Sequence, residues 1–183
     1  DPHRQDGVRH DLAELRLAGA RFAEWRANID PRTVGRGQVA VDAAALAHGA
    51  AASQAEGVLP LVTVAMPDLA SQSQAVTQAV VANALRALFD ELDGRGVDLA
   101  ALVLRISMVL PGDAHRNQPA PTEVAAATLR VLEETVPPQV AGVAFLSGGQ
   151  PVGRATTNLA AIVAAARQQR LPWRMTFAFT RAL

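Results

Sequence analysis

Five short apolar runs divide the chain into repeating units. These runs are rich in Val, Leu, Ile and Phe and lie at 21–29, 58–66, 101–109, 140–147 and 175–179. Ala-rich segments with apolar residues at helical spacing alternate with them, at about 8–18, 39–55, 71–93, 122–135 and 152–168. Runs of this length predict strands, and the longer periodic segments predict helices.

The alternation of strands and helices predicts βα units with right-handed crossovers around a parallel sheet. The strands are apolar almost throughout, which is typical of parallel sheets covered on both faces. Gly and Pro mark the joints at Gly57, Pro111-Gly112, Pro137-Pro138, Gly148-Gly149 and Pro172. No linker or low-complexity tract interrupts the pattern, so residues 1–183 are expected to form a single α/β domain.

Five βα units are fewer than a closed barrel needs. An eight-stranded barrel closes its ring of hydrogen bonds and typically takes about 250 residues, whereas this chain has 183. Five strands leave two free edges and a partly covered inner face. We therefore expect strands to be missing from one or both ends, and the open edges to be covered by self-association or by a partner chain.

The amino-acid composition argues against several classes of function. The chain has 17 basic and 17 acidic residues, a pI near 7.1 and no basic run, which argues against a nucleic-acid partner. No apolar run approaches the roughly 18 residues that span a bilayer, and no signal peptide is visible, so the sequence predicts a soluble cytoplasmic protein without a membrane partner. Cys is absent, and no metal-ligand spacing links His3, His10, His48 and His115. We expect no metal and no cofactor.

One charge interrupts the apolar run LVLRISMVLPG at 102–112. Arg105 lies among aliphatic residues, and an unpaired buried charge is costly. Its side chain should therefore point into a site or meet a counter-charge. All 17 basic residues are arginine, so the chain contains no lysine.

Four segments carry a resemblance to a known family: GARFAEWR (19–26), FLSGGQ (145–150), RATTNLAAI (154–162) and PWRMTFAFTRAL (172–183). They resemble, in the same order, the class I fructose-1,6-bisphosphate aldolase segments that run approximately GADFAKWR, FLSGGQ, EATLNLNAI and PWALTFSYGRAL. MVLPG (108–112) and ETVPPQVAGVAFLSGG (134–149) extend the match. The resemblance implies strands four to eight of a (β/α)₈ TIM barrel, with the first three strands and the family's C-terminal tail lying outside this chain.

The resemblance also implies a reaction, and the chain departs from it. The family cleaves fructose 1,6-bisphosphate into triose phosphates through a Schiff base on a strand-six lysine, in a segment like LLKPNMV. A desolvated lysine can lose its proton and attack a carbonyl. The matching position in VLRISMV is Arg105, whose guanidinium stays protonated and is a poor nucleophile. The resemblance therefore implies that the imine cannot form at this position.

Three neighbouring positions differ as well. The family's strand-four lysine corresponds to Glu24, and its strand-five carboxylates, in a segment like PIVEPEI, correspond to Thr63 and Ala65. We interpret the catalytic set as degenerate at these three positions and at Arg105. If Glu24 and Arg105 both face the barrel interior, we expect an ion pair that neutralises two costly charges. Thr63 and Ser107 are expected to be plain core or rim residues.

Phosphate-binding positions are better retained. By the resemblance, Ser147, Gly148 and Gly149 together with Arg181 hold one phosphate, and Arg26 lies near the other. Glycine lets backbone N–H groups approach an anion, and arginine offers a fork of donors. Thr180 stands where the family has glycine and crowds this approach. The simpler alternatives are that Ser147 to Gly149 form only a tight turn and that Arg26 pairs with an acid.

Three functions remain open from the sequence. The first is a degenerate aldolase homologue, a pseudoenzyme that binds a sugar phosphate or nothing and acts in regulation or scaffolding. The second is an active lyase or other sugar-phosphate enzyme that uses Glu24 and Arg105 without an imine, with arginine polarising a carbonyl oxygen. The third is a structural half barrel that assembles with another chain.

Overall fold

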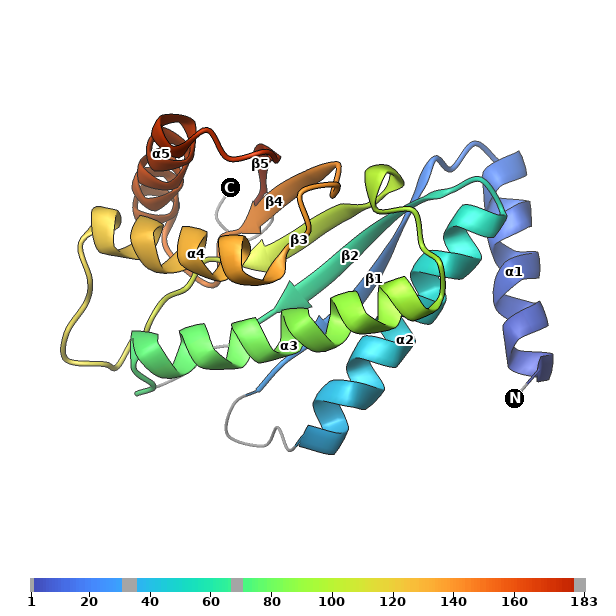
Figure 1. Cartoon of the computed structure of the whole chain (residues 1–183), viewed down its shortest axis with the longest axis horizontal. Coiled ribbons are helices and arrows are strands. Elements are labelled where there is room, and N and C mark those ends of the chain that lie inside the picture. Colours follow the sequence, from blue (N-terminus) through green and yellow to red (C-terminus); the bar gives the residue numbers. More distant parts are fainter. Residues whose placement is uncertain (1, 31–35, 67–70, 180–183) are drawn as a thin grey trace.

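A computed structural model describes residues 2–30, 36–66 and 71–179 (Figure 1). Five strands form, namely β1 (Phe22–Asn28), β2 (Leu59–Ala65), β3 (Val103–Ser107), β4 (Gly142–Leu146) and β5 (Arg174–Ala178). The helices are α1 (Pro2–Leu17), α2 (Arg36–Ala55), α3 (Gln74–Gly94), α4 (Pro121–Thr135) and α5 (Val152–Gln169), with a 3-10 turn at Leu99–Ala101. The predicted α/β alternation is therefore confirmed.

The five strands form one parallel sheet in the order β1-β2-β3-β4-β5. Each strand pairs with the next one along the chain, as in successive βα units of a barrel. Figure 1 shows α2, α3 and α4 along one side of the sheet, with α5 beside α4 and α1 beside α2. Within the part of the chain that the structure describes, β1 and β5 remain free edges and the barrel is not closed.

The hydrophobic core lies between the sheet and its helices. Alternate strand residues such as Val62, Leu104 and Phe145 are fully buried against helix residues that include Leu85 and Leu132. Side chains alternate between the two faces of a strand, so the intervening residues occupy the opposite face, which would be the inside of a barrel. We call this the inner face. Among the described residues, helices cover only the outer face of the sheet.

Local signals set several helix boundaries. The expected helix at 71–93 begins at Gln74 because the Ser73 hydroxyl accepts a hydrogen bond from the Val76 N–H and caps the first turn. Helix α1 begins earlier than the periodicity predicts, at Pro2. The α5 helix ends at Gln169, and its C-cap residue Arg170 has φ 56° in the left-handed region. No helix in the described ranges is long and apolar enough to cross a membrane.

Candidate functional site

The inner face carries a cluster of charged residues on β1 and β3. Strand register places Arg26 beside Thr63, Thr63 beside Arg105 and Arg105 beside Ala144. Glu24 lies two residues before Arg26 and therefore on the same face. We call Glu24, Arg26, Thr63 and Arg105 the inner-face cluster. In barrels of this type, sites form at the carboxyl ends of the strands.

Glu24 lies close to the other three residues of the inner-face cluster. One of its oxygens, Oε2, lies 2.7 Å from Arg105 Nη1, and the other, Oε1, accepts a hydrogen bond of 3.0 Å from the Thr63 hydroxyl. Arg26 Nη1 lies 3.8 Å from Oε1. The predicted pair between Glu24 and Arg105 is confirmed. Thr63 was expected to be a plain core or rim residue; it is buried, and its hydroxyl also positions the carboxylate.

The two members of the pair differ in exposure. The Arg105 side chain is 12% exposed, whereas that of Glu24 is 39% exposed. Burial raises the pKa of Glu24, but hydrogen bonds from Arg105 and Thr63 and the positive charges of Arg105 and Arg26 outweigh it and hold the pKa below its ordinary value. Glu24 is therefore ionised at neutral pH.

One donor of the Arg105 guanidinium is left without an acceptor. Its Nε is the buried side-chain atom that lacks a hydrogen-bond partner among the described residues. A buried, unsatisfied donor costs about 1–3 kcal/mol. An anion or a carbonyl oxygen that reached this nitrogen would remove that cost, so the cluster retains capacity for an acceptor.

The loop after β4 contains two glycines in the left-handed region. Gly148 and Gly149 have φ values of 63° and 85°, a region that favours glycine. Gln150 is buried and fixes the loop, because its side-chain N–H donates to the Ser147 carbonyl at 2.8 Å and its oxygen accepts from Asn158 at 2.6 Å. Sequence analysis did not identify this amide pair. The available signal was Asn158, an amide side chain on the helix that follows the loop.

The remaining predicted site residues divide into three groups. Arg26 donates from Nε to the Asn28 side chain at 3.1 Å and lies near Glu24, so the simpler expectation, an arginine paired with an acid, is confirmed. Ala65 is buried and supplies no polar side chain to the inner face. Arg181 and Thr180 lie outside the described residues.

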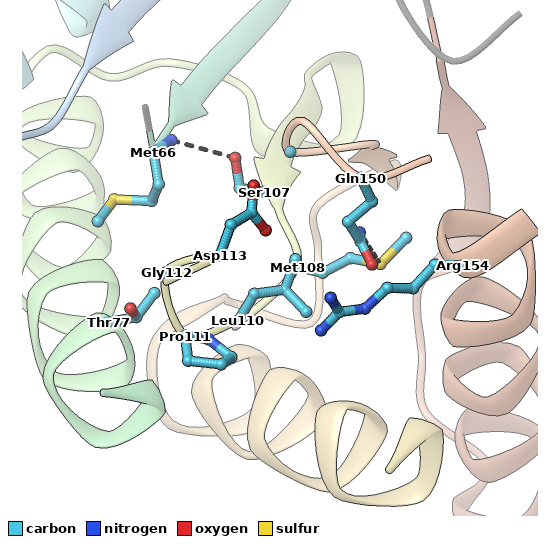
Figure 2. Close-up of a pocket in the computed structure, with 11 residues that line it drawn as sticks. Met66, Thr77, Ser107, Met108, Leu110, Pro111, Gly112, Asp113, Gln150 and Arg154 are labelled. Atoms are coloured by element: carbon cyan, nitrogen blue, oxygen red, sulfur yellow. Dashed lines mark hydrogen bonds between the residues drawn. The ribbon is translucent and has the colours of Figure 1, made fainter. Parts of the chain in front are cut away.

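A small hollow lies between the loops after β3 and β4 (Figure 2). We call it the loop hollow; it is lined by Met66, Ser107, Leu110, Asp113, Gln150 and Arg154, among others. Ser107 was expected to be a core or rim residue; its hydroxyl accepts a hydrogen bond from the Met66 N–H at 3.1 Å. The cavity volume of about 30 Å³ suits a water molecule rather than a sugar phosphate.

No group of three or more His, Asp or Glu side chains is arranged to hold a metal ion within the described ranges. The Nε2 of His10 lies 3.3 Å from Glu14 on α1. The Nδ1 of His115 lies 3.0 Å from the Asn117 carbonyl oxygen in the loop after β3. These two histidines therefore have local partners on their own segments.

The geometry first defines a class of protein, which is a parallel βα assembly with the strand order of a TIM barrel and a charged inner face. The model of the family "Glycolytic: Fructose-bisphosphate aldolase class-I" matches residues 3–183. The chain belongs to the class I fructose-bisphosphate aldolase family, as the sequence resemblance implied.

Individual relatives and a solved structure support the same family assignment. A probable class 1 fructose-bisphosphate aldolase of Xylella fastidiosa is 36% identical over 97% of this chain and 53% of its own length. The chloroplastic fructose-bisphosphate aldolase 3 of Arabidopsis thaliana is 37% identical over 97% of this chain and 45% of its own. The Plasmodium falciparum aldolase, crystallised with TRAP and a small-molecule inhibitor, superimposes with a TM-score of 0.91 at 33% identity, over 98% of this chain and 52% of that one.

The chain therefore spans about half the length of the relatives it matches. The matched half contains the inner-face cluster and the loop after β4.

Proposed function

We propose that this chain is a sugar-phosphate-binding member of the aldolase family that does not form a Schiff base. The observation that carries the proposal is Arg105, which occupies the inner face of β3 and binds Glu24 at 2.7 Å. The family resemblance assigns this position to the reactive lysine. A guanidinium remains charged at every accessible pH, so it can bind an oxygen but cannot attack a carbonyl as a free amine can.

Glu24 makes the alternative of an imine-free enzyme less favourable. A general base works best when its pKa lies near the operating pH. Burial raises the pKa of Glu24, but Arg105, Thr63 and Arg26 together hold it below its ordinary value. This carboxylate would abstract a proton weakly. The lyase activity of the family therefore remains the second candidate for this chain.

Phosphate binding is supported at two places along the carboxyl edge of the sheet. Ser147 to Gly149 form a loop with left-handed glycines, which can present backbone N–H groups to an anion. Arg26, three strands away on β1, is partly exposed and can reach a second anion. The spacing of three strands, about 14 Å at roughly 4.8 Å each, favours a ligand with phosphates at both ends over a single phosphate.

Borohydride trapping and calorimetry test the two parts of the proposal. Borohydride reduction with dihydroxyacetone phosphate is expected to leave the mass of the chain unchanged; a covalent adduct would overturn the imine-free assignment. Calorimetry with fructose 1,6-bisphosphate is expected to show binding that weakens in Arg26→Gln. The matched control is Arg21→Gln, which removes the same charge from the loop before β1 and should leave affinity unchanged. Equal affinity in both variants would refute the role of Arg26.

Asn158→Leu tests the loop. This change leaves the Gln150 oxygen without its donor inside a buried site, which costs about 1–3 kcal/mol of stability. Because Gln150 also holds the Ser147 carbonyl, we expect weaker sugar-phosphate binding as well. Asn158→Asp is the companion variant, and loss of stability with unchanged affinity in both proteins would show that the loop does not contact the ligand.

We also propose that the open inner face associates with another polypeptide. On β1, Phe22 is 61% exposed and lies next to Leu59 at the edge of the sheet, where a further strand can pair. Sedimentation equilibrium tests this proposal, which fails if the chain remains a monomer and Phe22→Ser leaves its solubility unchanged.

A further inference from the structure

Thr128 on α4 differs from other helical threonines in what its hydroxyl contacts. Four of them donate to the carbonyl four residues earlier in the chain, as helical threonines commonly do, namely Thr77 to Ser73, Thr135 to Val131, Thr156 to Val152 and Thr157 to Gly153. The Thr128 hydroxyl instead accepts a hydrogen bond of 3.0 Å from the Val109 N–H, just after β3. Both residues are fully buried. Thr128 therefore connects α4 to the backbone at the carboxyl end of β3.

The backbone of Val109 is held from two helices. Its N–H donates to Thr128 on α4, and its carbonyl oxygen accepts a hydrogen bond of 3.0 Å from the Gln74 side chain on α3. Because β3 ends at Ser107, these side chains satisfy backbone groups that lie beyond the strand. We call residues 108–110 the β3 extension. It follows the central strand, which lies between β2 and β4, so it is remote from the free edges β1 and β5.

The loop after β4 contacts this β3 extension at two places. The Gln150 side-chain N–H lies 3.5 Å from the Met108 sulfur and also donates to the Ser147 carbonyl at 2.8 Å (Figure 2). A Cβ built at Gly148 would lie 3.7 Å from Leu110 Cδ1, which shows that the glycine backbone packs on that side chain. The position of the loop therefore depends on the position of the β3 extension.

We propose that Thr128 is a positioning residue for the loop after β4. By holding the β3 extension, it keeps Ser147 to Gly149 in the orientation in which their N–H groups can meet a phosphate. This inference rests on the proposed function, because it concerns the phosphate contacts of that loop. Thr128 is fully buried on the outer side of the sheet, so it acts through Val109 and does not itself touch a ligand. Binding groups have to be held within about 0.5 Å by the residues that support them.

The substitution Thr128→Val keeps the shape of the side chain and removes its hydroxyl. The Val109 N–H would then be a buried donor without an acceptor, and the β3 extension would shift to recover a partner. We expect about fivefold to tenfold weaker binding of fructose 1,6-bisphosphate, since the energy of one hydrogen bond corresponds to about a tenfold change in affinity. Thr128→Ser keeps the hydroxyl and should bind close to the wild type.

The matched control is Thr135→Val on the same helix. It removes a hydroxyl that bonds only the Val131 carbonyl of α4, at 2.6 Å, and should leave affinity unchanged. Calorimetry on the 183-residue chain measures binding, and thermal unfolding checks that each variant is folded. Nuclear magnetic resonance supplies a readout that needs no ligand, because the amide signals of Gly148 and Gly149 should shift in Thr128→Val and stay in place in Thr128→Ser and in the control.

Gln74→Met is the second variant, and it decides the question if Thr128→Val does not fold. It removes the partly buried bond to the Val109 carbonyl and should shift the same two amide signals. The inference is overturned if Thr128→Val and Thr135→Val bind equally well, or if the signals of Gly148 and Gly149 stay in place in Thr128→Val and Gln74→Met. A wild type that binds no fructose 1,6-bisphosphate would instead overturn the proposed function, and the amide signals would still decide whether Thr128 positions the loop.

Discussion

The substitution Glu24→Gln removes the carboxylate charge that pairs with Arg105 in the inner-face cluster. The wild-type carboxylate accepts from Arg105 at 2.7 Å and from the Thr63 hydroxyl at 3.0 Å. Glutamine keeps an oxygen for Thr63 but has no negative charge for Arg105. The guanidinium, whose Nε already lacks a partner, would then be a largely buried cation without a counter-ion.

The expected cost lies between two limits. Two charges about 4 Å apart attract by about 4 kcal/mol at an effective dielectric constant of roughly 20. Breaking a fully buried pair costs about 3–5 kcal/mol, and an exposed pair contributes about 0–1 kcal/mol. Arg105 is 12% exposed and Glu24 is 39% exposed, so solvent screens one partner only. We expect Glu24→Gln to lower the free energy of unfolding by about 2 kcal/mol.

Urea unfolding at neutral pH measures this cost, and a double-mutant cycle with Arg105→Met isolates the pair. Arg105→Met should cost less, about 1 kcal/mol, because the more exposed Glu24 can be rehydrated. The control is Glu91→Gln, which breaks an exposed pair to Arg95 at 3.1 Å on α3 and should cost under about 0.5 kcal/mol. If Glu24→Gln costs no more than this control, the burial argument is refuted.

The pair also predicts a pH dependence with a definite sign. The pKa of Glu24 is lower in the folded chain than its ordinary value of about 4.3. The contribution of ionised Glu24 to the free energy of unfolding is therefore fully present above that value, and it is lost as the pH falls through the lowered folded pKa. The difference in stability between wild type and Glu24→Gln should shrink below about pH 4, and a difference that is constant with pH would contradict the assignment.

Two further substitutions test the packing and the chemistry. Gly49→Ala places a Cβ 2.1 Å from the Trp25 ring, so we expect a loss of about 2–3 kcal/mol in urea unfolding, whereas Gly153→Ala, with open space around it, should be neutral or slightly stabilising. Arg105→Lys should give no borohydride adduct with dihydroxyacetone phosphate, because the Glu24 carboxylate keeps a nearby amine protonated; an adduct detected by mass spectrometry would contradict this.

Among the described residues, periodicity alone predicted the order and type of the five strands and the five α-helices, but not the 3-10 turn at Leu99–Ala101. The strands were identifiable because parallel strands are apolar on both sides, so Val, Leu, Ile and Phe form short runs such as 140–147. The first and last residues of the helices were less predictable. Ser73 moves the start of α3 to Gln74 through a single hydrogen bond to the Val76 N–H, and side-chain caps of this kind change a boundary without changing the apolar period.

The site was only partly predictable. The pairing of Glu24 with Arg105 was expected from their opposite charges and from the positions that the family resemblance gives them at the barrel interior, since a pair lowers the cost of both charges. The contribution of Thr63 and the amide pair of Gln150 with Asn158 did not follow, because their hydrogen bonds depend on side-chain direction and on burial by distant segments.

The same Glu24→Gln variant separates stability from binding. In the folded chain the Glu24 carboxylate is paired with Arg105 and lies near Arg26. A phosphate would have to compete with this carboxylate for the same two cations. Removing that carboxylate frees guanidinium donors and deletes a repulsive charge, and we expect inorganic phosphate at low salt to bind more tightly, by roughly tenfold. Calorimetry on the wild type, Glu24→Gln and the Glu91→Gln control measures this change. Equal or weaker phosphate binding in Glu24→Gln would mean that Arg26 and Arg105 have a structural role between the strands and do not bind an anion.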